Sequence, residues 1–160
     1  MQEVSTNAKR LLQTEGPESM LKADYPKFER ALKRFAQKVE LDGAILTKRV
    51  AVDLFRRIIE KTPVDTGRAR ASWNIAIGAP DLRVMPEGAY TGEQLSGLKA
   101  ATVLATYGAD ARKRLPPIYI TNNLPYIVEL EKGSSRQAPR GMMALSLMEV
   151  TNNLNRLTGA

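Results

Sequence analysis

The chain has 160 residues, of which 43% are hydrophobic and 26% charged, so it is long enough to build one domain with its own core. It contains no cysteine and no histidine, which excludes a disulfide framework, a thiolate zinc site and the usual catalytic triads. An enzyme would therefore depend on carboxylate, lysine or tyrosine chemistry, and the sequence predicts neither a cofactor nor a metal.

No apolar run approaches the roughly 18 residues that a membrane span requires. Residues 1–5 lack the apolar region of a signal peptide, so we expect synthesis in the cytoplasm and no membrane partner. The net charge of +7 and the isoelectric point near 9.8 favour an anionic partner, with nucleic acid as the first candidate. The alternative is a solvated surface, because the basic residues are interleaved with acids.

Residues 1–23 are polar and weakly patterned, with a breaker pair at Gly16-Pro17. We interpret them as an N-terminal arm that packs on something else, such as a neighbouring subunit. A frayed terminus is the alternative. Residues 24–160 are predicted to form a single α+β domain.

The main helical segment is predicted over residues 24–61, with Asp24 as N-cap and Pro26 in the first turn. Its apolar residues form two helical stripes that are offset near Asp42-Gly43. Either one helix bends there, or two helices meet with Asp42 as the cap of the second. Glycine costs only about 1 kcal/mol in a helix interior, so we expect one long, bent helix. The stripes are Phe28, Leu32, Phe35 and Val39, then Leu41, Ile45, Val52, Phe55 and Ile59.

The outer face of this segment is basic. It is either an ordinary solvated surface or one that faces DNA or an acidic partner. Its members are Lys27, Arg30, Lys33, Arg34, Lys38, Lys48, Arg49, Arg56 and Arg57.

A corner follows, formed by Pro63, Asp65, Thr66 and Gly67. Proline ends the helix, the aspartate can bond the backbone two residues on, and glycine accepts a positive φ. Strict alternation then predicts a strand over residues 68–77. One face carries Ala69, Ala71, Trp73, Ile75 and Ile77, and the other carries Arg68, Arg70, Ser72 and Asn74.

Two further strands are predicted, a short return strand near residues 81–85 and a strong one over 117–122. A helix is possible over 93–107. A short helix is bracketed by Pro125 and Gly133. A polar loop over residues 134–141 and a closing helix over 142–157 complete the chain. The predicted fold is therefore α+β, with a long N-terminal helix and a C-terminal helix packed on a small, mainly antiparallel sheet.

Asp65-Thr66-Gly67 is also the tripeptide of aspartic proteases, in which two aspartates share a proton and activate water. Those enzymes place apolar strand residues before the aspartate and a small residue after the glycine. Here Pro63 precedes and Arg68 follows, which favours a turn-forming aspartate.

Candidate partner contacts are spread over both halves of the chain. Trp73 is interpreted as a core or interface anchor. Arg68 and Arg70 could be solvated, form intersubunit salt bridges or line a channel. Of Glu129 and Glu131, one is expected to pair with an arginine and the other to be solvated. The predicted contact residues are Arg68, Arg70, Trp73, Tyr126, Glu129, Gly133, Ser134, Gln137, Pro139 and Arg140.

Two stretches, residues 62–73 and 120–142, together resemble the neck or tail-completion proteins of tailed double-stranded DNA bacteriophages. In that family a Pro-Val-Asp-Thr-Gly corner follows a long helix and precedes a strand. A later segment with tyrosine, glutamate and glycine, ending in Gln-Ala-Pro-x-Gly-Met, precedes a terminal helix. The resemblance covers about residues 28–155. The arm and the longer 86–116 connection fall outside the shared pattern.

The resemblance implies a non-enzymatic virion protein that forms a homo-oligomeric ring, hexameric in the family, at the head–tail junction. Its expected partners are connector or head-closure subunits on one side and tail-terminator or tail-tube subunits on the other. It would assemble in the host cytoplasm, and channel DNA would attract its basic side chains without being read in sequence. Two other hypotheses are a basic DNA-binding protein acting alone and a hydrolase that uses the Asp65 carboxylate.

Overall fold

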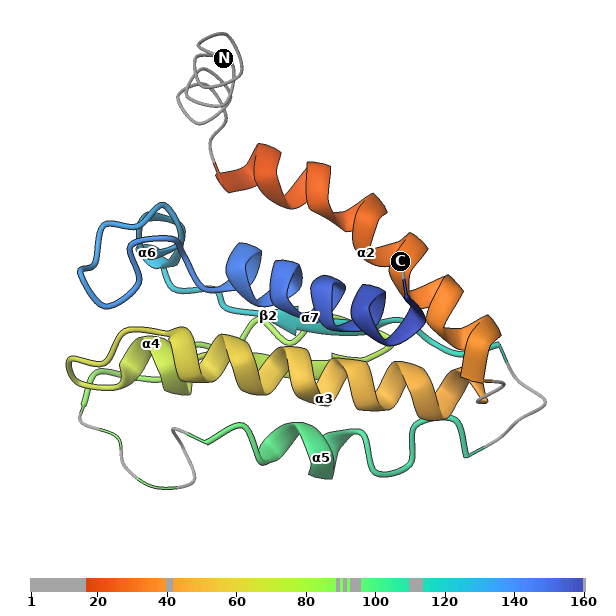
Figure 1. The fold of residues 1–160 in the computed structure, drawn as a ribbon. Helices are drawn as coiled ribbons and strands as arrows, with labels where there is room; N and C mark the ends of the chain where they lie inside the picture. The colour runs from red at the N-terminus through yellow and green to blue at the C-terminus, as the bar shows by residue number, and fades with distance from the viewer. Residues whose placement is uncertain are drawn as a thin grey trace, which may run out of the picture.

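The computed structural model of the chain describes residues 17–39, 42–88, 90, 92, 96–109 and 114–159, with side chains described from Tyr25 onward. Most of the predicted arm and part of the predicted 93–107 helix lie outside these residues. Within them, helices pack on a small two-stranded antiparallel sheet, so the α+β fold class is confirmed (Figure 1).

The predicted long, bent helix is wrong, because two separate helices occupy this part of the chain. Helix α2 spans Pro17–Val39 and helix α3 spans Gly43–Lys61. Asp42 has an extended backbone, with φ −52° and ψ 128°, and its Oδ1 accepts the Ala44 N–H at 2.7 Å. The aspartate thus satisfies a free donor at the start of α3, which makes a new helix favourable there.

The start of α2 also differs from the prediction. The helix begins at Pro17, so Asp24 and Pro26 lie inside it rather than at its first turn. Figure 1 shows the N-terminal end of α2 standing clear of the rest of the molecule. Its later turns pack along α7, Met143–Thr158, where Ala31 is fully buried against Val150 and Leu154.

The sheet consists of β1, Asn74–Ile77, and β2, Ile118–Thr121. The strands run antiparallel, with Ile75 opposite Ile120 and Ile77 opposite Ile118. Residues directly opposite share a face, so these four isoleucines form one apolar face. The predicted strand over 117–122 is thus confirmed.

Only the end of the predicted 68–77 strand is extended, because residues Arg68–Ala71 form a helical turn, α4. Ser72 was expected beside the arginines on an outer face. It is instead fully buried, and its Oγ accepts the Met85 N–H at 3.2 Å. A single turn is too short to show a period of 3.6, so alternating alanines and arginines imitate a strand.

The predicted return strand near residues 81–85 is also wrong, because this segment has no strand pairing. Side chains hold it instead. Asn74 Nδ2 donates to the Arg83 carbonyl at 2.7 Å, and the Thr121 hydroxyl donates to the Asp81 carbonyl.

Helix α5, Lys99–Val103, is shorter than the 93–107 helix suggested by the sequence and packs against α3 and β1. Lys99 Nζ donates to the carbonyls of Ala71 and Trp73 and lies 5.5 Å from the centroid of the Phe55 ring. Burial lowers the pKa of this lysine. The ammonium therefore holds α5 to the chain that leads into β1.

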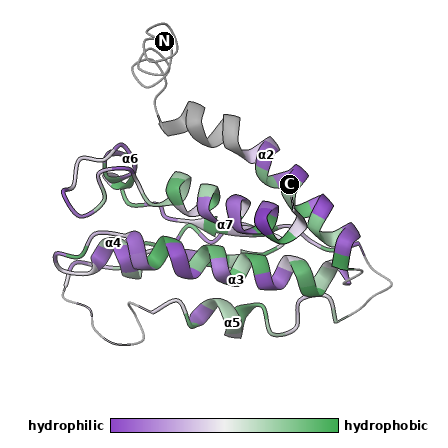
Figure 2. Cartoon of the chain, in the orientation of Figure 1, coloured by the Kyte–Doolittle hydropathy of each residue, from purple (hydrophilic) through white to green (hydrophobic). Residues whose placement is uncertain are grey.

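The closing part of the chain follows the prediction closely. Helix α6 spans Ile127–Glu131, and α7 ends in the left-handed Gly159. Figure 2 shows hydrophobic and hydrophilic residues alternating around α3 and α7, as expected for helices with one buried side. The main core contains Phe55, Ile58, Trp73, Leu104 and Met142. No described helix is both long and apolar enough to cross a membrane.

Candidate functional site

The predicted corner begins with a buried hydrogen-bond chain at the end of α3. Thr62 is 1% exposed, and its Oγ1 donates to the Ile58 carbonyl at 2.7 Å. The same oxygen accepts the indole N–H of Trp73 at 2.8 Å. Burying an indole N–H is favourable only when it finds an acceptor, so Thr62 and Trp73 depend on each other.

Arg70 completes the end of α3 from the outside. Its guanidinium donates to the Thr62 carbonyl at 2.9 Å and to the Glu60 carbonyl at 3.2 Å. These are carbonyls that a helix end leaves without an intrahelical partner. Burial lowers the pKa of Arg70, and the Glu60 carboxylate acts in the opposite direction. The structure thus places this predicted contact residue within the corner.

The turn itself is formed by Thr66 and Gly67. The Thr66 hydroxyl accepts the Arg68 N–H at 3.3 Å, whereas the prediction assigned such a bond to Asp65, which is exposed. Gly67 has φ of +87°, as the turn prediction required. The Thr66 hydroxyl, two residues before the Arg68 donor, thus takes the local acceptor role that was predicted for the Asp65 carboxylate.

The second motif contains a helix cap made across a loop. Glu131 accepts the N–H groups of Met142, Met143 and Ala144 at 2.8, 2.9 and 2.9 Å. These are free donors at the start of α7, where the helix dipole also favours a negative charge. One of Glu129 and Glu131 was expected to pair with an arginine and the other to be solvated. Glu131 does neither, because its carboxylate caps α7. Glu129 pairs with Lys132 at 2.9 Å.

Two glycines allow this loop to close on itself. A Cβ on Gly133 would lie 2.4 Å from the Pro139 carbonyl oxygen, and one on Gly141 would lie 2.4 Å from the Glu131 carbonyl oxygen. Their φ angles are +87° and +74°. Between them, Ala138 is 4% exposed and enters the core beside Met142. The polar loop over residues 134–141 is thus anchored to the core by its buried alanine, and its two flanking glycines permit the close backbone approaches.

Gln137 joins the two motifs directly. Its Oε1 accepts the Val64 N–H at 3.0 Å, and its Nε2 donates to the Val64 carbonyl at 3.2 Å. The amide side chain therefore pairs with one residue of the corner as a neighbouring strand would. The two stretches that carry the family resemblance meet at this point.

A cleft of about 280 Å³ lies where the motifs meet. Asp65 is the one carboxylate among the described residues that line it, so these residues of a single chain supply one acid and not a pair. The described residues also contain no group of three acidic, histidine or cysteine side chains placed to hold a metal. The lining consists of residues 63–69, Tyr126, Leu130, Ser135 and Gln137.

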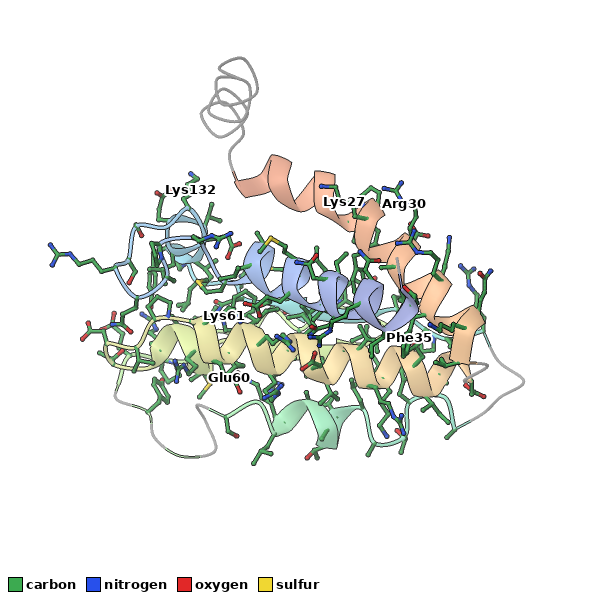
Figure 3. The ribbon with its side chains drawn as sticks, viewed as in Figure 1. Lys27, Arg30, Phe35, Glu60, Lys61 and Lys132 are labelled. Atoms are coloured by element: carbon green, nitrogen blue, oxygen red, sulfur yellow. The ribbon has the colours of Figure 1, made fainter. Side chains whose placement is uncertain are left out.

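The predicted contact residues divide into two groups. Trp73 and Arg70 are used within the domain. Arg68 also turns inward, with Nε donating to the Met85 carbonyl at 2.9 Å and Nη1 lying 3.4 Å from Glu87. Those with substantial exposure are Tyr126, Glu129, Ser134, Gln137, Pro139 and Arg140. Figure 3 shows Lys132, next to this group, directed away from the body of the molecule.

The basic face predicted for the helices is partly neutralised. Arg57 binds Asp53 and Glu149, both at 2.9 Å, and Lys61 binds Glu149 at 2.7 Å, which joins α3 to α7. Burial raises the pKa of both carboxylates. Hydrogen bonds from their basic partners outweigh this, so each pKa lies below its ordinary value of 3.8 or 4.5. Arg57 and Lys61 of α3 therefore serve helix packing.

Several residues of the site were not identified from sequence. Asn122 donates from Nδ2 to the Ala69 carbonyl at 2.8 Å and accepts the Leu124 N–H at 3.2 Å. An asparagine before Pro125 was a signal for a local turn. Neither its contact with α4 nor the Glu131 cap had a local signature, because the partners are distant in sequence.

The chain matches no family model, and no curated protein or solved structure that matches it was found.

Proposed function

We propose that the chain is a structural component of the head–tail junction of a tailed double-stranded DNA bacteriophage. It acts by assembling into a ring and docking between connector and tail subunits, without a chemical step. The proposal comes from the resemblance of the corner and of the 120–142 segment to neck and tail-completion proteins.

The observation that carries the proposal is the Gln137–Val64 pair. A corner motif alone is only moderately specific, whereas two motifs in the same order are far less common by chance. Two atoms of one side chain bond both backbone groups of the corner residue, at 3.0 and 3.2 Å. This contact supports the interpretation of the motifs as parts of one structural unit.

The exposed surface of that unit suits contact with other macromolecules. Arg136 and Arg140 are exposed, and neither forms an ion pair among the described residues. They lie on a loop that is attached to the domain by the buried Ala138 and by the bonds between Gln137 and Val64. Such cations can face acidic partner residues or channel phosphates without reading sequence.

Native mass spectrometry of the full chain tests the proposal, first alone and then with the connector and tail-tube proteins encoded beside its gene. The expected result is a ring of defined stoichiometry, or a ring formed on addition of the connector. A strictly monomeric chain under all of these conditions would count against the proposal. We also expect the gene to lie between the head genes and the major tail-tube gene.

The net charge of +7 also favours a second candidate function, that of a DNA-binding protein that acts alone. A channel protein should bind DNA weakly and with a steep salt dependence, because its contacts are with phosphates. Fluorescence anisotropy with unrelated duplexes distinguishes the two. Affinity independent of sequence is expected here, and a nanomolar, sequence-specific site at physiological salt would favour the alternative.

A further inference from the structure

Among the described residues, no strand pairs with the outer edge of β2. Gly78 lies opposite Pro117 and donates to its carbonyl at 2.8 Å, so in this register the pairs that bond across the ladder are at alternate positions. Tyr119 and Thr121 therefore face β1. The N–H and C=O groups of Ile118 and Ile120 point to the other side and have no hydrogen-bond partner among the described residues.

The surface beside this edge is apolar. A groove of about 470 Å³ runs between β2 and helices α2, α3 and α7. None of the described residues that line it is charged, and the apolar lining continues past β2 onto Phe28, Leu32 and Leu147. A sheet of two strands thus covers only part of the apolar surface that the helices offer. The edge and the groove together have the shape and chemistry of a missing third strand.

We infer that this groove receives the N-terminal segment, residues 1–16, of a neighbouring copy, which adds a strand to β2. This inference rests on the proposed ring and names the contact that closes it. The added backbone would bond the outward N–H and C=O groups of Ile118 and Ile120. Its apolar side chains would cover the groove.

The sequence of the segment fits this role. Val4, Thr6 and Ala8 alternate with Ser5 and Asn7, so an extended segment has one less polar side for the groove and one polar side for water. Sixteen extended residues span up to about 50 Å, enough to reach another subunit.

The direction of α2 favours a neighbour over the segment's own groove. Tyr25 lies in the groove lining, whereas Pro17 lies eight residues earlier, about 12 Å further along the helix axis. Figure 1 shows this end of α2 directed away from the body. The chain before Pro17 would have to reverse direction to return to its own β2.

Cysteine cross-linking tests the inference cleanly, because the natural chain contains no cysteine. Tyr119→Cys places a thiol on the outer face of β2, opposite the face of the groove isoleucines. Asn7→Cys places one on the polar side of the arm, and Thr6→Cys, pointing to the other side, is the matched control. The two single-cysteine chains are mixed, oxidised and separated on a denaturing gel.

Covalent dimers of the Asn7→Cys and Tyr119→Cys chains, at least about fivefold more abundant than with Thr6→Cys, are expected from the two-residue period of a strand. The register of the added strand against β2 is not specified, so the experiment is repeated with Ser5→Cys and Lys9→Cys, which lie on the same side of an extended segment as Asn7. A third chain carries both Asn7→Cys and Tyr119→Cys. If its cross-link forms only within one chain, the assignment to a neighbour is overturned.

Two outcomes separate this inference from the proposed function. Rings without a cross-link at any of these positions overturn the arm contact and leave the ring standing. Cross-linked copies that never close into a ring support the arm contact and count against the proposed function.

A second set of variants does not depend on the register. Val50→Glu puts a charge into the groove and should weaken self-association by about tenfold or more. Leu98→Glu, at a site 68% exposed and outside the groove, is the control. Circular dichroism melting first shows that both fold. A folded Val50→Glu chain that assembles as well as the natural one overturns the inference.

Discussion

Two regions of the molecule differ in how completely their polar groups are bonded and their apolar surfaces buried. One is the junction, where the corner at residues 62–67 meets the 120–142 segment. The other is the flank, the outer edge of β2 with the apolar groove beside it. At the junction, Thr62, Arg70, Glu131 and Gln137 each bond backbone groups or side chains at least eight residues away in the sequence. At the flank, the outer groups of β2 have no described partner, and an apolar groove stays open. A domain that is closed at one end and incomplete at the other is suited to gain its remaining contacts by assembly.

The largest loss of stability at the junction is expected from a substitution of Gly141. Gly141→Ala places a Cβ 2.4 Å from the Glu131 carbonyl oxygen on a backbone with φ of +74°. Backbone strain and overpacking together should lower the free energy of unfolding by about 3 kcal/mol. Urea denaturation measures this, with Gly43→Ala as the control because nothing lies within 4 Å of its added Cβ. Equal stability of the two variants would contradict the tight loop closure.

A smaller loss is expected at Thr62. Thr62→Val keeps the shape of the side chain but leaves the buried Trp73 N–H without its acceptor. The cost should be about 1–3 kcal/mol, measured by thermal or urea unfolding. Thr151→Val is the control, since the Thr151 hydroxyl bonds only the Leu147 carbonyl in its own helix. If both variants lose the same amount, the Thr62–Trp73 bond contributes nothing specific.

The ion pairs that Arg57 forms with Asp53 in α3 and with Glu149 in α7 predict an acid-sensitive contribution to stability. The folded pKa values of Asp53 and Glu149 lie below their ordinary values of 3.8 and 4.5. Their contribution is therefore present above about pH 4.5 and is lost as the pH falls through the lower, folded values. Both carboxylates are about one-third exposed, so the effect should be of the order of 1 kcal/mol.

Arg57→Met should flatten this part of the stability–pH curve, because it removes a partner of both acids. Arg49→Met, at an exposed arginine with no ion pair among the described residues, is the control and should leave the curve unchanged. Urea denaturation at several pH values from 3 to 7 gives both curves. An unchanged slope in Arg57→Met would show that the pairs do not couple to folding.

Gln137→Ala should affect the junction locally. The two bonds to Val64 are exposed, so the global loss should be only about 1 kcal/mol. The Val64 amide, a donor to Gln137, should exchange its hydrogen faster. Hydrogen exchange followed by NMR checks this, with Arg136→Ala as the neighbouring control. Unaltered exchange at Val64 would mean that the amide pair does not hold the motifs together.

The smallest effect on folding is expected at the open flank. Tyr25 is 59% exposed at the groove, so Tyr25→Ser should change the free energy of unfolding by less than about 0.5 kcal/mol. The same variant should weaken ring formation in native mass spectrometry. A loss of stability above 1 kcal/mol would show that the flank is already complete in the single chain.

The sequence by itself determined the features that have local causes. The spacing of apolar residues predicted α7, β-propensity predicted β2, and the Pro125 and Gly133 bracket predicted α6. The sequence marked Asp42-Gly43 as an irregular point, but the low cost of one glycine favoured a single bent helix, which is wrong because Asp42 caps a new helix. The turn at Gly67 also followed from its sequence.

Only the tertiary structure decided which distant groups meet. Glu131 caps a helix that begins beyond a loop, and Gln137 pairs with Val64 from the other half of the chain. Neither has a periodic signal, because a hydrogen bond across the fold depends on the path of the loops between its partners. The strand predicted over residues 68–77 is wrong at residues 68–71, where the single helical turn α4 is too short to show its period. Alternation identified the buried Ala69 and Ala71, whereas it placed Ser72, which the tertiary structure buries, on the opposite face.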